Sequence, residues 1–159
     1  MDKLSNDDCF YFNLSISFRT VSGVMERTLK RTGLTPMQFL ALKSLYENDG
    51  MTIKELSELL MHDSTTITRL VDRLEKAGIV IRKSDDIDRR VINVFLSESA
   101  KSYAPRAKKI WHRVNRILKS NFNNADLIGF FNVMNRIKEL SFQRERTLRE
   151  TARELHGRI

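Results

Sequence analysis

The fold predicted for this chain depends on the stretch DSTTITRLVDRLEKAG, residues 63–78. Its apolar residues recur at every third or fourth position, the spacing that forms one buried stripe along a helix. Asp63 is a residue type that caps a helix start, and Gly78 is the type that ends one. We therefore predict a single amphipathic helix between these two residues.

The opposite face of this predicted helix is polar and carries small hydroxyl groups and arginines. Small side chains let a helix backbone approach the DNA major groove closely, and arginine binds guanine or phosphate. An ordinary solvated helix face has a similar composition, so the surrounding sequence has to decide between the two interpretations. The candidate DNA-facing residues are Ser64, Thr65, Thr66, Thr68, Arg69 and Arg73.

A second short helix is predicted immediately before this stretch. Residues 52–55, TIKE, form a capping box that opens it. Because only Met61 and His62 separate the two helices, they must cross steeply, as in a helix-turn-helix. A tight helical hairpin without a DNA role is the alternative.

Two further helices are predicted upstream. Residues 35–38, TPMQ, combine a cap, a proline in the first turn and a capping-box glutamine, and they open a helix that ends at residues 48–50, NDG. The first helix of the chain is expected to run from Asp7 or Asp8 to Gly33.

Beyond Gly78 the pattern changes to strands. Residues 79–83 and 91–96 are rich in β-branched residues, and the polar, charged residues 84–90 between them read as a turn. A helix-turn-helix followed by such a hairpin is a winged helix. Asp88 stands two residues before Arg90, where a carboxylate can orient a guanidinium toward a narrow minor groove. The alternative is a solvated turn without a function.

The composition is that of a folded, mostly helical protein. Six glycines and two prolines in 159 residues favour helices, and the one cysteine excludes an intramolecular disulfide or a Cys-based zinc site within one chain. Residues 1–8 lack the features of a signal peptide, and no apolar run reaches the roughly 18 residues of a membrane span. We expect a cytoplasmic protein that has no membrane partner.

The net charge of +8 is unevenly distributed. Residues 1–51 carry six basic and six acidic residues, and residues 52–96 carry eight of each. Residues 97–159 carry fourteen basic and six acidic residues, which accounts for the whole excess. The predicted winged helix is therefore neutral, and the placement of its individual charges has to carry any DNA binding.

Long helices are predicted toward the C-terminus. Ser97 is expected to cap one that Pro105 kinks, and another starts near Asn124 or Ala125. The helix that Ser97 caps contains a basic stripe, for which a solvated face is the plainest interpretation. The alternatives are a wall for an anionic ligand, a contact with DNA phosphates or a contact with an acidic patch across a dimer. The stripe consists of Arg106, Lys109, Arg113 and Arg116.

The terminal helices, residues 7–33 and 97–156, carry more apolar surface than a lone winged helix could cover. Leu148, Ala152 and Leu155 continue the last apolar face within a highly charged segment, residues 144–158. Pairing across a two-fold axis is the economical way to bury this surface, so we predict a dimerisation region at both ends of a single protomer, residues 1–159.

The sequence of residues 35–97 resembles the MarR family of bacterial winged-helix regulators, and the flanking lengths fit as well. This resemblance implies a homodimer that binds pseudo-palindromic promoter DNA through residues 35–96, usually as a repressor. It also implies release by a small phenolic or anionic ligand or by cysteine oxidation. The motifs that carry it are LTPMQF (34–39), IKEL (53–56), LVDRLEKAGIV (70–80), DRR (88–90) and LS (96–97).

Position by position, the resemblance places the six candidate DNA-facing residues named above against the major groove and its phosphates. Arg90 enters the minor groove with Asp88 orienting it, and Arg89 and Lys83 contact phosphates. An effector pocket is expected between the second helix and the first and fifth helices. The residues expected to line it, each of which could equally be plain core, are Phe18, Phe39, Tyr46 and Trp111.

Cys9, near the start of the first helix, is the one thiol. Its surroundings resemble the start of the hydroperoxide-sensing branch of the family, but that branch places tyrosines where this chain has Gly23, Met25, Pro36 and Phe39. A buried, inert cysteine is therefore preferred over a redox sensor.

Catalytic and metal-binding motifs are missing from the sequence, and the three histidines share no ligand spacing. We predict neither an enzyme nor a cofactor. The alternatives to a ligand-responsive regulator are a thiol-based redox switch on DNA and a basic helical adaptor for a protein or an anionic surface.

Overall fold

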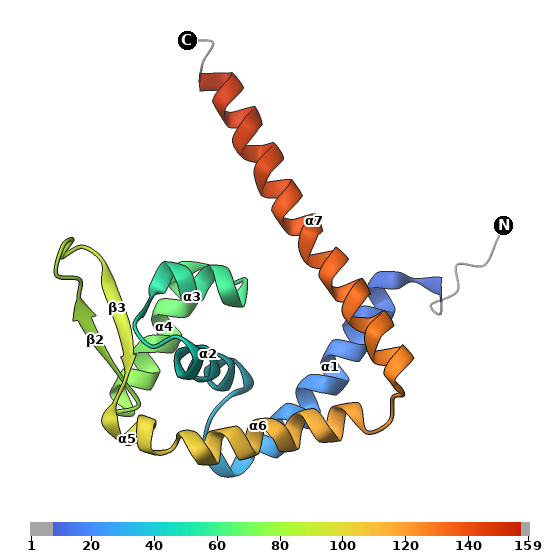
Figure 1. Cartoon of the computed structure of the whole chain (residues 1–159). Helices are drawn as coiled ribbons and strands as arrows, with labels where there is room; N and C mark the ends of the chain where they lie inside the picture. The colour runs from blue at the N-terminus through green and yellow to red at the C-terminus, as the bar shows by residue number, and fades with distance from the viewer. Residues whose placement is uncertain (1–7, 157–159) are drawn as a thin grey trace. The chain divides into compact units, whose positions relative to one another are not determined.

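The structure is a computed structural model that describes the backbone of residues 8–156 and the side chains of residues 8–140 (Figure 1). The chain divides into two compact units, of which the first ends at Leu118 and the second begins at Lys119. The elements follow in the order α1 (Phe10–Leu29), the 3-10 helix η2 (Lys30–Thr32), α2 (Pro36–Glu47), β1 (Met51–Thr52), α3 (Ile53–Leu60), α4 (Ser64–Lys76), β2 (Val80–Ser84), β3 (Ile92–Leu96), α5 (Glu98–Ser102), α6 (Ala104–Lys119) and α7 (Asn124–His156).

The strands form one antiparallel sheet in the order β1-β3-β2. The predicted hairpin pairs Val80 with Leu96 and Ser84 with Ile92. The third strand, β1, was not predicted. It pairs Met51 with Val94 and is only two residues long, because the capping box of α3 begins at Thr52. The predicted fold class, a mainly helical winged helix-turn-helix with a small antiparallel wing, is confirmed.

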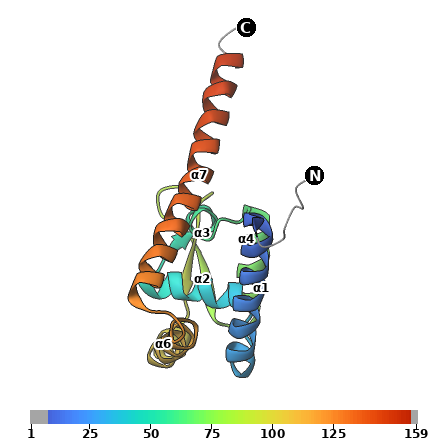
Figure 2. The ribbon, with the colours of Figure 1, turned by 90° about the vertical axis from the view of Figure 1, so that its right-hand side faces the viewer.

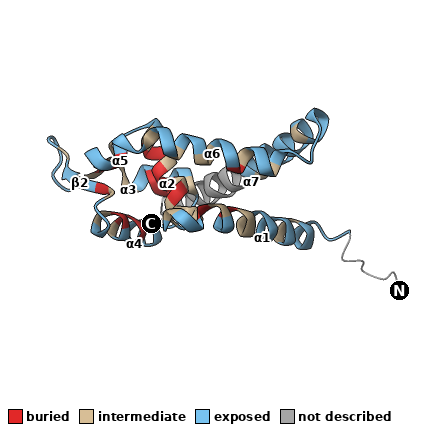
Figure 3. Cartoon of the chain, turned by 90° about the horizontal axis from the view of Figure 1, so that it is seen from below, coloured by how far each residue is buried: buried red, intermediate tan, exposed pale blue. Residues whose placement is uncertain are grey.

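The first unit has two apolar clusters, and α2 contributes to both. Leu45 of α2 packs with Leu56, Ile67 and Val94 in the winged helix. Phe39, six residues earlier, packs with residues of α1 and α6. Accordingly α2 lies between α6 and α1 (Figure 2), and buried residues gather on it (Figure 3). Burial of α2 on two sides therefore joins the winged helix to the flanking helices.

The predicted caps are present. Thr35 and Thr52 each accept a hydrogen bond from the third residue of their helix, whose glutamine or glutamate side chain bonds back. Asp63 caps α4, and the Ser97 hydroxyl accepts a hydrogen bond from the backbone of Ala100. These local signals explain why the starts of these four helices could be read from the sequence.

Two helix boundaries differ from the prediction. The first helix begins at Phe10 rather than at Asp8, with Cys9 as its cap, while Asp7 lies outside the described residues. The helix after Ser97 is broken at Tyr103 instead of being kinked further on. Pro105 is the second residue of α6, where a helix needs no backbone N–H, so the proline begins a new helix rather than bending a continuous one.

The wing is tied to α4 by one arginine. The Arg82 guanidinium on β2 forms salt bridges of 2.7 Å with Asp72 and 2.6 Å with Glu75, both on α4. It also donates a hydrogen bond of 3.3 Å to the backbone oxygen of Thr68. The orientation of the wing is thus fixed relative to the helix that precedes it.

Apolar side chains remain exposed in each unit considered by itself. Tyr11 and Phe18, on the N-terminal half of α1, are 79% and 71% exposed. In the second unit, Phe122, Ile128, Phe130 and Leu140 are exposed. The predicted apolar residues of the last helix beyond these, Leu148, Ala152 and Leu155, and the charged residues 144–158 lie outside the described side chains. Within the described part of the chain, no helix is long and apolar enough to span a membrane.

Replacing Gly50 with alanine should destabilise the fold. Gly50 has a φ of +86°, and an added Cβ would lie 2.6 Å from Cε1 of Phe95. We expect a loss of about 2–4 kcal/mol in the free energy of unfolding, from backbone strain of about 1 kcal/mol and overpacking. Denaturant unfolding at fixed protein concentration measures it.

Gly33→Ala is the matched control, because Gly33 also has a positive φ of 72° but nothing lies within 4 Å of its added Cβ. It should lose about 1 kcal/mol from backbone strain alone. Equal losses for the two variants would show that the contact with Phe95 relaxes freely.

Replacing Arg82 with alanine should loosen the wing. The variant leaves Asp72 and Glu75 without their shared cation, and we expect a loss of about 1–2 kcal/mol in unfolding free energy. Arg82→Lys, which keeps the charge but loses the fork of donors, should fall between wild type and alanine. Unchanged thermal and denaturant unfolding would mean that the tie does not stabilise the protein.

Candidate nucleic-acid interface

The start of α4 is fixed by Asp63. Its carboxylate accepts a hydrogen bond of 2.8 Å from the backbone N–H of Thr66 and one of 2.7 Å from the Thr66 hydroxyl. These bonds, the side-chain bond first, lower the pKa of the Asp63 carboxyl below its ordinary 3.8. The ionised carboxylate therefore satisfies the first turn and holds the helix at the position where its exposed face begins.

The exposed face of α4 presents unengaged polar side chains. Ile67, Leu70, Val71 and Leu74 are buried in the winged-helix core and fix the rotation of the helix. In the part of the chain that the structure describes, no hydrogen bond or ion pair engages four of the side chains on the opposite side, which leaves their donors free for a ligand. These exposed residues are Ser64, Thr65, Arg69 and Arg73.

Two of the predicted DNA-facing hydroxyls already use their protons. Thr66 donates to Asp63, and Thr68 donates to the backbone oxygen of Ser64 at 2.7 Å. Both residues are exposed. Their outward features are therefore a methyl group and acceptor lone pairs rather than a donor, and such a methyl can contact a thymine methyl.

The tip of the wing is organised by Asp85, a residue the sequence analysis did not single out. Its carboxylate accepts hydrogen bonds from the backbone N–H of Ile87 at 2.9 Å and of Asp88 at 3.1 Å, and from the Asn93 amide at 3.2 Å. These bonds, that from Asp88 first, lower the pKa of the Asp85 carboxyl below its ordinary 3.8. Its place as the first aspartate of the polar turn is the signal that could have identified it.

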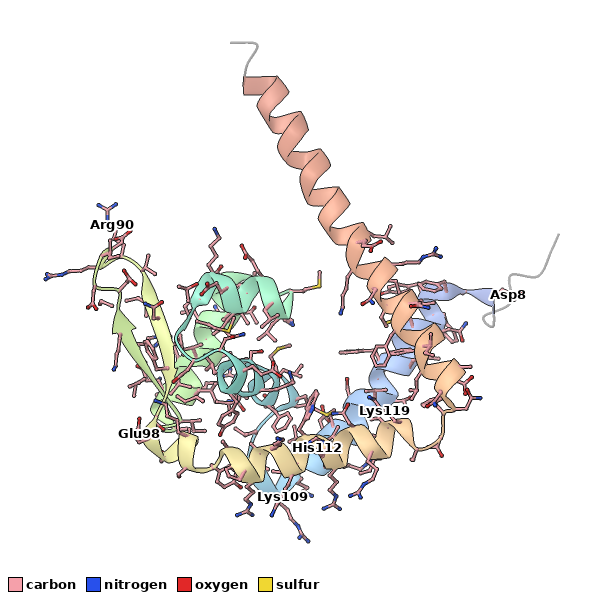
Figure 4. The ribbon with its side chains drawn as sticks, in the orientation of Figure 1. Asp8, Arg90, Glu98, Lys109, His112 and Lys119 are labelled. Carbon is pink, nitrogen blue, oxygen red and sulfur yellow. The ribbon has the colours of Figure 1, made fainter. Side chains whose placement is uncertain are left out.

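The structure of the single chain does not show the predicted contact between Asp88 and the Arg90 guanidinium. Asp88 accepts a hydrogen bond of 3.0 Å from the backbone N–H of Arg90, and within the described residues it forms no ion pair with the Arg90 guanidinium. The short aspartate side chain reaches the backbone two residues on more readily than the far end of an arginine. Arg90 consequently extends from the wing tip (Figure 4).

The other two wing cations are placed differently from each other. Arg89 is exposed beside Arg90. Lys83 is exposed on β2, with its Nζ 5.2 Å from the centre of the Phe95 ring. The sequence analysis also did not identify Arg82, which links the wing to α4. Because it stands one residue before Lys83, it lies on the opposite face of the strand, toward α4.

A cavity of about 830 Å³ lies in the first unit, against α2, α5, α6 and the loop between α4 and β2. Phe39 and Trp111 stack along it, with ring centres 6.1 Å apart. Tyr46 also lines it and donates a hydrogen bond of 2.7 Å to the backbone oxygen of Ala100. Burial, and secondly Tyr103, raises the pKa of the Tyr46 hydroxyl above its ordinary 10.0, so this group is a neutral donor.

Two lysines, Glu47 and a histidine border the cavity. The Lys43 Nζ lies 5.1 Å from the centre of the Trp111 ring and 2.7 Å from a carboxylate oxygen of Glu47. Lys108 and His112 contribute to the lining from α6. An apolar slot with cations at its wall fits an aromatic anion.

Phe18 does not line this cavity, unlike the other three residues predicted for a pocket. It lies two turns before Met25, the first residue of α1 that packs on α2 and α6, and its side chain is exposed. The cavity therefore borders the turn after α1, through Thr32 and Leu34, and not the helix itself.

Cys9 is exposed, so the prediction of a buried cysteine is wrong for the single chain. The reason is the later start of α1: Cys9 precedes its first turn as the cap and lies outside both apolar clusters.

The comparisons with known proteins agree with this architecture. A model of the MarR family matches residues 34–92. The HTH-type transcriptional regulator SarZ of Staphylococcus epidermidis is 31% identical over 124 residues, which are 78% of this chain and 78% of SarZ. The organic hydroperoxide resistance transcriptional regulator of Bacillus subtilis is 34% identical over 96 residues, 60% of this chain and 64% of that protein.

Among solved structures, the transcriptional repressor CouR bound to a 23-mer DNA duplex has a TM-score of 0.78 with this chain. The match covers 87% of this chain and 98% of CouR at 21% identity, and so it shows the fold alone. The family match, the identity to SarZ and the winged helix-turn-helix lead to one conclusion: the chain belongs to the MarR family of DNA-binding transcriptional regulators.

Proposed function

We propose that the protein is a homodimeric repressor that binds pseudo-palindromic promoter DNA and is released by an aromatic anion. The observation that supports DNA binding is the exposed polar face of α4, which lies beside a wing from which Arg90 extends. Arg82 links this wing to α4 through its two salt bridges. In this arrangement Arg69 and Arg73 bind bases and phosphates in the major groove, and Arg90 enters the minor groove.

The exposed apolar residues support the dimer. Those on the N-terminal half of α1 and those of residues 122–140 exceed the isolated exposed side chains expected of a monomer surface. A two-fold axis that buries them would place two α4 helices about 34 Å apart, one turn of DNA. The symmetry of the protein would then match that of the operator.

The cavity supports the effector. Its stacked Phe39 and Trp111 offer an aromatic slot. Lys43, which is paired with Glu47, offers a positive charge, and the Tyr46 hydroxyl, whose proton is donated to Ala100, offers an acceptor oxygen. Ala77, Gly78 and Ile79, which follow α4, form part of its wall. A ligand bound there contacts the end of the DNA-reading helix, which is how binding of the ligand would lower affinity for DNA.

Arg69→Ala and Arg90→Ala should each weaken operator binding by about 10- to 100-fold, the value of one good base or groove contact. Fluorescence anisotropy with a duplex from the promoter upstream of this gene, at several stated salt concentrations, measures the loss. Each variant should also reduce the salt dependence, because phosphate contacts release counterions.

Lys30→Ala is the control, because Lys30 is an exposed cation on η2, away from α4 and the wing. It should bind the operator as wild type does. Unchanged binding by both arginine variants would refute the site, and equilibrium sedimentation that finds only monomers at micromolar concentration would refute the dimer.

An aromatic carboxylate, with 4-hydroxybenzoate as the probe, should quench the fluorescence of Trp111 and release the operator. Trp111 is the one tryptophan of the chain, so the signal reports on the cavity directly. Lys43→Ala should weaken binding of the probe by about 10-fold or more, the value of a charge-assisted contact.

Lys30→Ala again serves as the matched lysine control and should leave the affinity for the probe unchanged. Quenching that is equal in wild type and Lys43→Ala would show that the cation does not hold the carboxylate. Absence of quenching at millimolar probe would refute the aromatic-anion proposal while leaving the DNA proposal intact.

A further inference from the structure

One surface of the first unit is basic, and of its residues only Lys108 has been given a role, at the wall of the cavity. The segment 104–118 of α6 carries five basic residues and no acidic residue. All five side chains are exposed, and among the described residues none of them forms an ion pair. We call this surface the α6 basic face; it consists of Arg106, Lys108, Lys109, Arg113 and Arg116.

The α6 basic face is not the packing side of its helix. Val114 is fully buried, and Ile110 and Trp111 pack against the cluster that joins α6 to α1 and α2. The basic residues occupy the remaining circumference of the helix. Four of them, at positions 106, 109, 113 and 116, follow the helical spacing and form one row.

This face also lies far from the DNA-reading surface. Lys109 points outward from α6 on the side of the unit away from the wing tip that carries Arg90 (Figure 4). A straight duplex held by α4 and the wing therefore does not reach the α6 basic face.

We propose that the α6 basic face binds the phosphates of a second duplex DNA segment without regard to sequence, while α4 and the wing hold the operator. The proposal rests on the proposed function, because it adds a second DNA contact to an operator-bound regulator. Its consequence is that one protein molecule bridges two DNA segments, or two distant parts of one molecule.

The composition of the face favours a polyanion over a folded protein or a membrane. Protein interfaces have an apolar, often aromatic centre, whereas the apolar residues of α6 are used in the core. A helix that lies in a membrane surface needs an apolar face to insert, and that face is likewise occupied. Arginine makes up three of the five cations, and its planar fork suits phosphate.

The distribution of charge favours DNA as that polyanion. Residues 52–96 carry eight basic and eight acidic residues, so the winged helix contributes no net attraction to phosphates at a distance. The row from Arg106 to Arg116 extends about 15 Å along the helix axis, a length over which duplex DNA carries about nine charges. The cations of the face can therefore each meet a phosphate.

A two-duplex capture experiment tests the proposal. Full-length protein is loaded on an immobilised operator duplex, and retention of a labelled duplex of unrelated sequence is measured over a series of salt concentrations. Wild type should retain the second duplex with a steep salt dependence. The double variant Lys109→Glu/Arg113→Glu should retain at least 10-fold less of the second duplex. The slope of its log affinity against log salt concentration should be smaller by about 2, because each lost phosphate contact lowers the slope by about 0.9.

The matched control is Lys30→Glu/Arg31→Glu, which makes the same change of charge at two exposed residues of η2. It should retain the second duplex as wild type does. Operator affinity of both double variants should stay within twofold of wild type, and this shared readout also reports that they fold. If Lys109→Glu/Arg113→Glu does not fold, the milder variant Lys109→Gln/Arg113→Gln is used in its place.

Three results would overturn the proposal: no second duplex retained by wild type, equal retention by the α6 variant, or equal loss in the η2 control. Duplex RNA and phosphatidylserine vesicles are run in parallel. Retention of either in preference to DNA, abolished by the α6 variant, would assign the face to that partner instead. Loss of operator binding in Arg69→Ala and Arg90→Ala is measured separately, so failure of the operator site and failure of the second site are distinguishable.

Discussion

The burial of α2 on two sides is the constraint on which the first unit depends. Leu45 is held in the winged-helix core, and Phe39 is held against α1 and α6. Because both clusters are built on one helix of twelve residues, the exposed polar face of α4, the cavity and the α6 basic face have fixed positions relative to one another. Removal of large side chains from such a core costs about 2–5 kcal/mol, so both clusters are needed for a stable unit.

Local signals made much of this fold predictable. The caps Thr35, Thr52, Asp63 and Ser97 act through atoms within three residues, and the winged-helix core follows from apolar periodicity. Residues that act across the chain were harder to find. The pairing of β1 with β3 joins residues about forty positions apart, and nothing in two residues signals a strand.

The same distinction holds for the candidate site. The exposed face of α4 could be read from helical spacing, because burial of four apolar residues determines what faces outward. The hydrogen bonds that these side chains form could not be predicted from helical spacing. Thr68 has a backbone oxygen one turn away, and Asp88 has a backbone N–H two residues on, so each forms the nearest bond instead of facing a ligand. Phe18 does not line the cavity of the single chain. Periodicity predicts which face of a helix is apolar, but it does not predict where along that helix the packing neighbour ends.

The placement of the cavity beside the end of α4 has a mechanical consequence. Gly78 and Ile79 form part of its wall, while the other end of the helix is the capped turn at Asp63. The 13 residues of α4 span about 20 Å, so the cavity lies at the pivot of a lever. A rotation of only about 3° at that pivot displaces the far end by about 1 Å, a shift large enough to break hydrogen bonds to base edges. In the proposed function, a ligand that moved this end of α4 would shift the other end out of register with the DNA.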